Sequence, residues 1–314
     1  MRLGDLNYFL VVARTGNLGL AAKELGLTQP ALTKAVQRLE SDLGLRLFER
    51  TRRGMLLTGV GDAFFRSTAR VGVAFNEAVQ EARDLHFGEV GVVRVGVVPP
   101  FAEMLFSPAC SELVMHRPAA TVRVMINLNH ELLSALSLGE LDVVLSPLPE
   151  KRSPELAYET LFEDEWVIAG RDRHPLLGRR NLRFEDIAKA SWVLPAAKVQ
   201  GREWLERCLQ DRNLPPPRIA VENNSSVAYV VPVVRNSNFL TVIAGVVLRS
   251  PAGQGLTAIP HKDAVWRRDV GISTRRAGYQ SPLVQYFIDI LRRHAASFSR
   301  GLSSRQSVPR VRRK

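Results

Sequence analysis

The residues best suited to chemistry in this chain are amide, hydroxyl and cationic side chains that recur four residues apart near the N-terminus. Gln29, Thr33 and Gln37 follow this spacing beside Lys34 and Arg38, with no acid among them. Residues four apart share one face of an α-helix. Gln can contact adenine with two hydrogen bonds, Thr offers a hydroxyl and a methyl, and Lys reaches guanine or phosphate. The pattern therefore indicates a helix face that reads DNA bases, although the same residue types also occur on ordinary solvated surfaces.

Three predicted helices would position this face. The first, of apolar period three to four, ends at Thr15-Gly16-Asn17, and Asn17 can cap a second helix over residues 18–25. Thr28 can cap a third helix that runs to about Glu40, and Pro30 lies in its first turn, where the missing N–H costs little. Two short helices joined by a tight glycine turn, the second one presenting polar groups, form a helix-turn-helix.

The segment after the third helix resembles the signature of the LysR-type transcriptional regulators over about the first 65 residues. The matching positions are Leu39-Glu40, Leu43-Gly44, Leu47-Phe48, Arg50, Leu57-Thr58 and Gly61. The resemblance implies that the third helix enters the major groove and that the following hairpin is a wing against the DNA backbone. Gly54 permits the hairpin turn, and the Arg residues of the wing suit phosphate or minor-groove contact. The candidate DNA-contacting residues are Thr28, Gln29, Pro30, Thr33, Lys34, Gln37, Arg38, Arg50, Arg52 and Arg53.

A long helix is predicted over residues 59–87, after a winged domain at 1–58. Its apolar residues recur at steps of three and four, as in a coiled-coil seam. They are Val60, Phe64, Val71, Phe75, Ala78, Ala82 and Leu85. A helix of this length reaches roughly 40 Å, too far for one small domain to cover. The resemblance implies an antiparallel dimer through this linker helix, which we assign to 59–88; the alternative is packing on the body of the same chain.

From residue 89 onward, strand-like apolar runs alternate with helices, which predicts an α/β body with a parallel sheet. The pattern occurs twice, so two lobes are expected. The resemblance implies that the last segment returns to the first lobe, with crossings near Leu161 and Ala264, as in periplasmic binding proteins. The expected fold is a winged helix-turn-helix, a linker helix and an α/β effector domain at 89–296, with lobe I at about 89–161 and 265–296 and lobe II at about 162–264.

Ligands of such folds bind between the lobes, at the carboxyl ends of strands and the N-termini of helices. The candidate effector-binding residues are Val98, Pro99, Pro100, Phe101, Asn127, Asn129, Ser146, Pro147, Lys198, Gln200, Arg202, Asn224, Ser225 and Ser226. The family often has a Ser or Thr hydroxyl where Val98-Pro99-Pro100 stands, which argues against a carboxylate held there. The Asn and Ser residues favour a neutral polyol, a sugar or an amide as the ligand. Lys198 or Arg202 could instead bind an organic acid. Each Asn taken singly is as well explained as a helix or turn cap.

The charge distribution predicts that any contact with a polyanion such as DNA is made by the two ends of the chain. The sequence has 43 Lys and Arg against 31 Asp and Glu, a formal net charge of +12. Residues 1–66 hold 10 basic and 6 acidic residues and residues 292–314 hold 8 basic residues and no acid, whereas the stretch between has 25 of each. Residues 297–314 are predicted to be a basic disordered tail.

The sequence carries none of the common phosphate-loop, dinucleotide, nucleophile-elbow or HExxH motifs, and its two Cys residues form no metal-ligand spacing. We therefore expect no enzyme and no cofactor. The expected partners are double-stranded DNA, a polar small-molecule effector, a second copy or three further copies of the chain, and RNA polymerase. The expected location is the cytoplasm, because neither an export signal nor a membrane span is apparent. A solute receptor of the periplasmic type is the rival interpretation, and the N-terminal DNA module argues against it.

Overall fold

The computed structural model describes residues 3–51, 54–87, 91–223 and 227–304. The chain divides into two units, Met1–Gly88 and Glu89–Lys314, and each is described by itself. No described helix is long and apolar enough to span a membrane.

The N-terminal unit contains the three predicted helices, a two-stranded hairpin and a long helix. They are α1 (Leu3–Thr15), α2 (Leu18–Glu24), α3 (Gln29–Leu43), β1 (Phe48–Thr51), β2 (Gly54–Leu57) and α4 (Gly59–Phe87). The Asn17 side chain accepts hydrogen bonds from the amides of Gly19 and Leu20, so the predicted cap of α2 is confirmed. Thr28 stands at the N-cap position of α3, but its side chain accepts no such bond, and that prediction was wrong. An N-cap side chain accepts from the amides of the first helical turn, and Pro30 in that turn has no N–H to donate.

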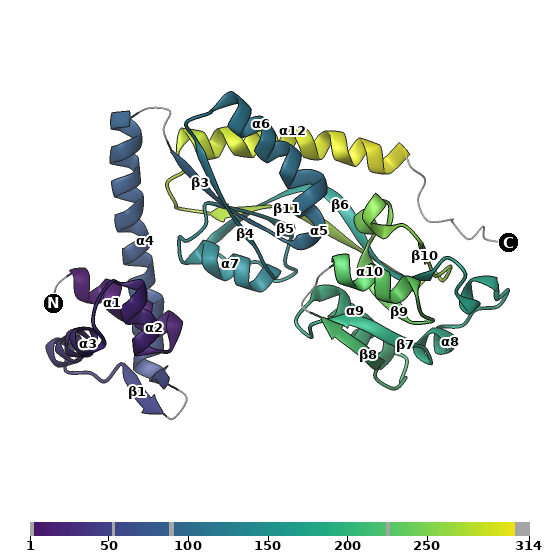
Figure 1. Ribbon diagram of the computed structural model, residues 1–314, viewed down its shortest axis with the longest axis horizontal. Helices are drawn as coiled ribbons and strands as arrows, with labels where there is room; N and C mark the ends of the chain where they lie inside the picture. Colours follow the sequence, from purple (N-terminus) through teal and green to yellow (C-terminus); the bar gives the residue numbers. More distant parts are fainter. Residues whose placement is uncertain (1–2, 52–53, 88–90, 224–226, 305–314) are drawn as a thin grey trace. The chain divides into compact units, whose positions relative to one another are not determined.

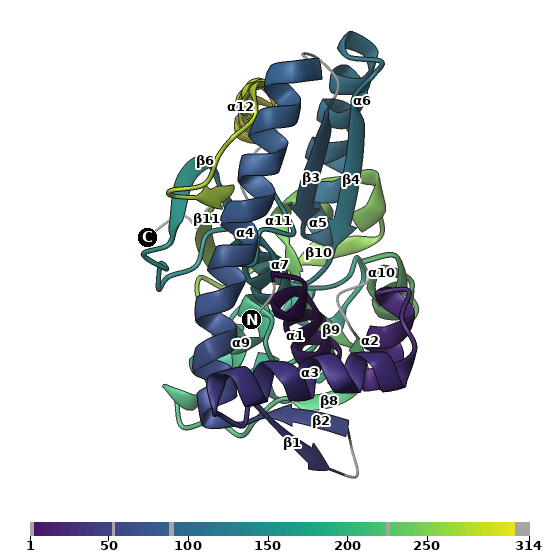
Figure 2. The same cartoon turned by 90° about the vertical axis from the view of Figure 1, so that its left-hand side faces the viewer.

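The hairpin is anchored to the turn between α1 and α2, and Figure 2 shows α3 and the hairpin within this unit. The Met55 amide donates to the Gly16 carbonyl at 2.8 Å. Gly54 has a φ of +124°, and a Cβ there would lie 2.3 Å from the Gly16 oxygen. Only glycine fits this backbone position, which confirms the predicted turn.

The long helix α4 has one face buried in its own unit and one exposed apolar face. The ring of Phe64 lies 5.1 Å from that of Phe9, and Phe65 lies 6.4 Å from it. Phe64 is thus part of the domain core, and its assignment to the exposed seam was wrong. Val71 and Phe75 are each 53% exposed, and Val60 is 50% exposed. The side chain of Leu85 lies outside the described residues.

The second unit is built on one mixed sheet with two parallel halves. Its strands are β3 (Val92–Val97), β4 (Thr121–Ile126), β5 (Val143–Pro147), β6 (Leu156–Arg171), β7 (Ser191–Pro195), β8 (Arg218–Asn223), β9 (Leu240–Ala244), β10 (Leu256–Ala258) and β11 (Val265–Arg275). The order is β4-β3-β5-β11-β6-β9-β7-β8, with β10 on β6. The strand β3 is parallel to β4 and β5, and β7 is parallel to β8 and β9. We call the half with β3, β4 and β5 the first lobe and the half with β7, β8 and β9 the second lobe.

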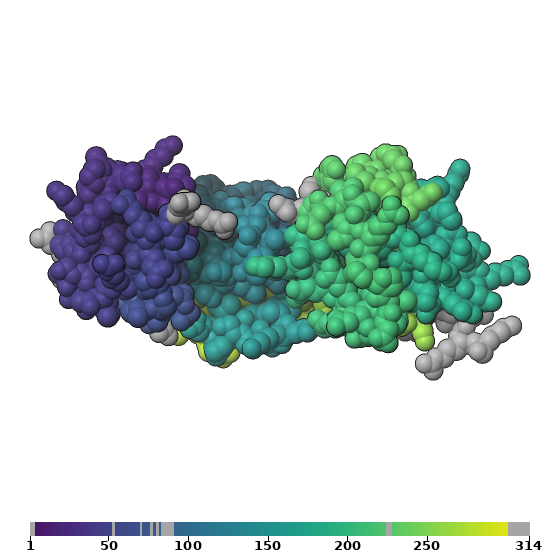
Figure 3. Space-filling view, turned by 90° about the horizontal axis from the view of Figure 1, so that it is seen from below, coloured from purple at the N-terminus to yellow at the C-terminus, as the bar shows by residue number. Residues whose placement is uncertain are grey.

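Two long antiparallel strands join the lobes. The strands β6 and β11 pair from Leu156 with Arg275 to Val167 with Val265. One end of this ribbon adjoins β5 and the other adjoins β9. The predicted crossing near Leu161 falls inside β6, and Ala264 directly precedes β11. The lobes adjoin in Figure 3, where the dark blue and teal surface of the first lobe meets the green surface of the second.

Helices cover both faces of the sheet (Figure 1). They are α5 (Pro99–Phe101), a π-turn (Ala102–Phe106), α6 (Ser107–His116), α7 (Asn129–Ser137), α8 (Phe184–Ala188), α9 (Gln200–Gln210), α10 (Val227–Arg235), α11 (Gly245–Leu248) and α12 (Pro282–Ser304), with 3₁₀ turns at Pro175–Gly178 and Pro251–Gly253. The predicted disordered tail was wrong over residues 297–304, because α12 continues to Ser304. The Phe298 ring packs 5.4 Å from Phe162 and holds this extension on the core. Residues 305–314 lie outside the described residues.

Candidate DNA-binding surface and effector pocket

The exposed face of α3 carries the predicted base-reading side chains. Leu32 and Leu39 are fully buried on the opposite face, so the orientation of the helix is fixed by the core of the unit. Gln29, Lys34 and Gln37 are exposed, as are Thr28 and Pro30 at the start of the helix. Thr33 is half-buried, and its hydroxyl donates to the Gln29 carbonyl at 2.9 Å.

Arg38 differs from its neighbours on α3, because it is bound to an acid. Its Nε lies 3.3 Å from Oδ2 of Asp5, and a second guanidinium nitrogen contacts the other carboxylate oxygen. Asp5 is 2% exposed, and its hydrogen bond raises the pKa of Arg38. Arg38 is exposed on α3 as predicted, but its guanidinium is paired with the buried Asp5 carboxylate, which the sequence did not indicate. The ion pair joins α1 to α3.

The signature residues that carried the resemblance hold the wing in place. The Glu40 carboxylate accepts hydrogen bonds from the amides of Leu47 at 2.7 Å and Phe48 at 3.1 Å. The Thr58 hydroxyl accepts from the Gly61 amide at 2.9 Å and starts α4. Arg50 on β1 is exposed. Arg52 and Arg53 lie outside the described residues.

A pocket of about 90 Å³ lies between the lobes of the second unit. It opens between α5 and α7 of the first lobe and α9 and β9 of the second. The predicted residues that line it are Val98, Pro99, Pro100, Asn127, Asn129, Pro147, Lys198 and Gln200.

Three predicted residues do not line the pocket. Phe101 is fully buried beneath it, and Ser146 is fully buried with its hydroxyl donating to the Pro147 carbonyl at 3.3 Å. Arg202 binds the Glu206 carboxylate at 2.7 Å, the Pro195 carbonyl at 3.1 Å and Glu222. Burial works against the charge of Arg202, but these carboxylates raise its pKa overall. Arg202 therefore joins α9 to β7 and β8 within the second lobe. Residues 224–226 lie outside the described residues.

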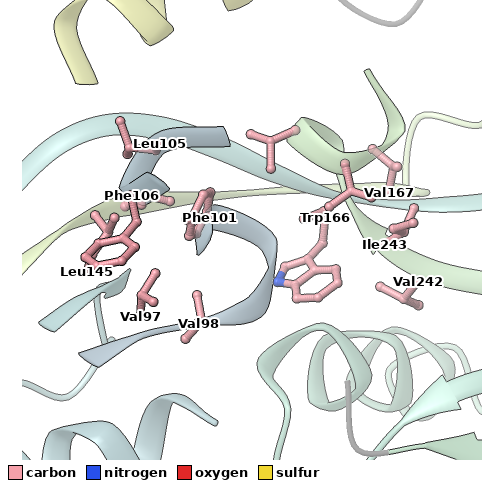
Figure 4. Packing of buried hydrophobic residues seen from close by; sticks show 14 of the residues in the cluster. Val97, Val98, Phe101, Leu105, Phe106, Leu145, Trp166, Val167, Val242 and Ile243 are labelled. Carbon is pink, nitrogen blue, oxygen red and sulfur yellow. The ribbon is translucent and has the colours of Figure 1, made fainter. Parts of the chain in front are cut away.

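The sequence prediction missed twelve residues of the pocket wall. They lie mainly on β6, β9 and β11 and on the segments next to these strands. The missed lining residues are Leu128, Trp166, Pro195, Val199, Asn223, Val230, Thr241, Val242, Ile243, Ala244, Val247 and Arg268. Figure 4 shows Trp166 between Val98 on one side and Val242 and Ile243 on the other. The available signal was Arg268 within the apolar run at 265–274 and Trp166 at the start of the run at 166–169, since a charged side chain rarely lies within a buried strand.

Arg268 of β11 is a buried cation at the pocket wall. It is 8% exposed, and its Nη2 lies 3.1 Å from Oδ2 of Asp164, which is opposite it on β6. Its guanidinium lies 4.4 Å from the centre of the Trp166 ring and 5.9 Å from that of Phe101. Burial lowers the pKa of Arg268, and the Asp164 carboxylate opposes this shift. The pair is electrically neutral as a whole.

Three buried polar atoms at the pocket wall have no hydrogen-bond partner within the described residues. They are Nε1 of Trp166, Oδ1 of Asn129 and Nε of Arg268. The Asn129 amide nitrogen donates to the Pro147 carbonyl at 2.9 Å, which leaves its oxygen directed elsewhere. Buried polar groups are normally paired, so these atoms suit a bound ligand. Among the described residues, no group of His, Cys, Asp and Glu could hold a metal ion.

A helix-turn-helix with an exposed polar face, in one chain with a two-lobed α/β unit that holds a pocket, defines a ligand-responsive DNA-binding regulator. The profile described as "Bacterial regulatory helix-turn-helix protein, lysR family" matches residues 3–62, and that described as "LysR substrate binding domain" matches residues 87–296. The chain belongs to the LysR family of transcriptional regulators. It is therefore a DNA-binding regulator switched by a small molecule, and the reading as a stand-alone solute receptor is not favoured.

Curated relatives match most of the chain. The HTH-type transcriptional regulator GbpR of Azospirillum brasilense is 30% identical over 267 residues, covering 83% of this chain and 78% of the relative. The uncharacterized regulator YdcI of Escherichia coli strain K12 is 30% identical over 300 residues, covering 93% and 95%.

Solved structures share the fold. A variant of full-length OxyR from Pseudomonas aeruginosa has a TM-score of 0.63 at 23% identity and covers 94% of each chain. Full-length CbnR, in a complex with its target DNA, has a TM-score of 0.58 at 22% identity, covering 94% of this chain and all of that one.

Proposed function

We propose that Gln29, Thr33 and Lys34 of α3 contact base edges in the major groove, while Arg50 of the wing, with Arg52 and Arg53, contacts the DNA backbone. The observation that carries this assignment is the exposed face of α3, whose opposite face is buried in the domain core. Thr28, Pro30 and Gln37 frame the same face. Arg38 acts indirectly, since Asp5 holds it.

The effector of this regulator occupies the pocket between the lobes. The pocket supports this assignment because it combines apolar walls with unpartnered buried polar atoms, on Asn129 of the first lobe and on Trp166 and Arg268 of the joining ribbon. A ligand shifts the lobe arrangement only by its differential affinity for two arrangements. Transcription changes when that shift reaches the paired DNA-binding units and RNA polymerase.

The chain acts as a homo-oligomer in the cytoplasm. Support for a first self-contact comes from Val71 and Phe75 on α4, which expose an apolar stripe. Support for a second comes from the edge strand β4 and the adjacent α6, where Ile126 is 57% and Met115 is 76% exposed. Exposed apolar stripes on a long helix and on a sheet edge are typical of self-association. The two surfaces together give a dimer of dimers.

The test separates base reading from backbone contact. Genomic fragments are selected on the purified protein, and affinity for a selected and a random duplex is then measured for each variant. Gln29→Ala should reduce affinity for the selected duplex alone, at about 1 to 3 kcal/mol per lost base contact. Arg50→Ala should weaken both duplexes and flatten the salt dependence. Equal losses on both duplexes for Gln29→Ala would refute the base-reading role of α3.

A further inference from the structure

The lining of the interlobe pocket limits the chemistry of the effector, and the inference here rests on the proposed binding of effector in that pocket. Its walls are mainly aliphatic and aromatic side chains, including Val98, Trp166, Val242 and Ile243 (Figure 4). A sugar or polyol needs a hydrogen-bond partner for nearly every hydroxyl that it buries. The mainly apolar wall of this pocket offers too few hydrogen-bond partners for a sugar. The body of the ligand must therefore be apolar.

The charge of the lining indicates one negative group on the ligand. No Asp or Glu lines the pocket within the described residues, and its two cations are Lys198 and Arg268. Arg268 is neutralised by Asp164 at 3.1 Å. Lys198 is exposed and has no ion-pair or hydrogen-bond partner among the described residues. The pocket thus presents a single uncompensated positive charge, at the edge formed by the second lobe.

The helix starts around the pocket differ in the backbone amides that they offer. In the first lobe, α5 begins with Pro99 and Pro100, which have no N–H, whereas α7 begins at Asn129 and keeps its first amides. In the second lobe, α9 starts at Gln200, and both Gln200 and Lys198 line the pocket. The backbone N–H groups of this first turn therefore lie close to Lys198. Helix N-termini with free amides favour anions, whereas a start blocked by two prolines does not.

Trp166 supplies an independent mark of a ligand at the same place. It is 7% exposed, and its Nε1 has no partner among the described residues. Gly201, in the first turn of α9, lies directly on the Trp166 ring, since a Cβ at Gly201 would approach that ring to 2.7 Å. The unpaired indole N–H, the start of α9 and Lys198 therefore converge on one part of the pocket.

We infer that the effector is a small organic acid with an apolar body and one carboxylate, and that the carboxylate binds at Lys198 and the first turn of α9 in the second lobe. The apolar body lies against Val98, Pro99 and Pro100 of the first lobe. The indole N–H of Trp166 donates to an oxygen of the ligand. The two prolines leave the start of α5 without an amide for the carboxylate, and the uncompensated cation of the pocket among the described residues is Lys198.

The experiment uses the full-length protein and a panel of linear, alicyclic and aromatic monocarboxylates, each matched with its neutral amide, together with glucose and galactose. Binding is measured by thermal shift and by calorimetry. At least one monocarboxylate should stabilise the protein, and its amide should bind about tenfold to a hundredfold more weakly, the range for a hydrogen bond to a charged group. Lys198→Gln should weaken the acid by the same factor and leave the amide unchanged, and Lys198→Arg should retain most of the affinity.

Two further variants keep the outcomes distinct. Lys189→Gln makes the same charge change at an exposed site outside the pocket and should leave acid binding unchanged. Asn127→Trp fills the pocket from its exposed rim and should abolish binding of every ligand. If only sugars bind, if amides bind as well as acids, if no panel member binds, or if Lys198→Gln leaves acid affinity intact, the inferred ligand class is wrong. Loss of that binding in Asn127→Trp would still support the pocket itself, whereas unaffected binding would refute the proposed effector site.

Discussion

The buried pair of Asp164 and Arg268 gives a quantitative test of how the two lobes are held together. Asp164 is fully buried, contacts the Arg268 guanidinium at 3.1 Å and accepts a hydrogen bond from the Val246 amide at 3.3 Å. Asp164→Asn keeps the shape but leaves the buried guanidinium without its counter-charge. Breaking a buried ion pair from one side costs about 3 to 5 kcal/mol of unfolding free energy. Glu163→Gln is the matched control, because Glu163 faces Arg267 across 3.6 Å with both side chains largely exposed.

The assay is equilibrium unfolding in urea followed by tryptophan fluorescence. All four Trp residues, at positions 166, 192, 204 and 266, belong to the second unit, so the signal reports that unit alone. Asp164→Asn should lower its unfolding free energy by about 3 to 5 kcal/mol, and Glu163→Gln by less than about 1 kcal/mol. A loss of under about 1 kcal/mol for Asp164→Asn would show that water or another group compensates Arg268, and the reasoning would fail.

Other predictions concern the N-terminal unit, the oligomer and the thiols. Phe75→Asp should dissociate the α4 dimer by placing two charges at the seam, and an unchanged sedimentation coefficient would count against that seam. Asn17→Ala removes a cap with two hydrogen bonds and should lower the stability of the N-terminal unit by about 1 kcal/mol, measured by circular dichroism of the helical signal against wild type. Gly54→Ala should weaken DNA binding on all sequences, because the new Cβ displaces the wing from the α1–α2 turn; wild-type affinity would contradict this. Burial raises the pKa of the Cys110 and Cys208 thiols, so peroxide should leave DNA binding unchanged, and a peroxide-dependent shift in a mobility assay would refute this.

The helix-turn-helix was predictable because its signals are local. Helical periodicity, the Asn17 cap and the turn at Gly54 all act within a few residues of themselves. The ion pair of Arg38 with Asp5 was not predictable. It depends on the packing of α1 against α3, which buries Asp5. The end of α12 was missed for a related reason, since one aromatic contact by Phe298 outweighs a polar, serine-rich composition.

The effector pocket was predicted only where it follows the ends of parallel strands. Asn127 and Pro147 come at such ends and do line the pocket. The first part of β6 was not recognised as a strand, because Glu159, Glu163 and Glu165 interrupt its apolar residues. Its pairing with β11, about a hundred residues further along the chain, brings Trp166 and Arg268 to the pocket wall. No local pattern encodes such a distant pairing.

The ribbon of β6 and β11 also determines what kind of movement the lobes can make. Two separate flexible linkers would allow the lobes to open freely, but these two strands are hydrogen-bonded to each other from one lobe into the other. Such a ribbon resists stretching and yields most easily in twist. Its register shifts between Val270 and Gly271, where a Cβ at Gly271 would lie 1.9 Å from the Glu159 oxygen. Irregularities of this kind concentrate twist. We therefore expect the lobes to move mainly by a rotation of one relative to the other about this ribbon, and a bound ligand to change that angle.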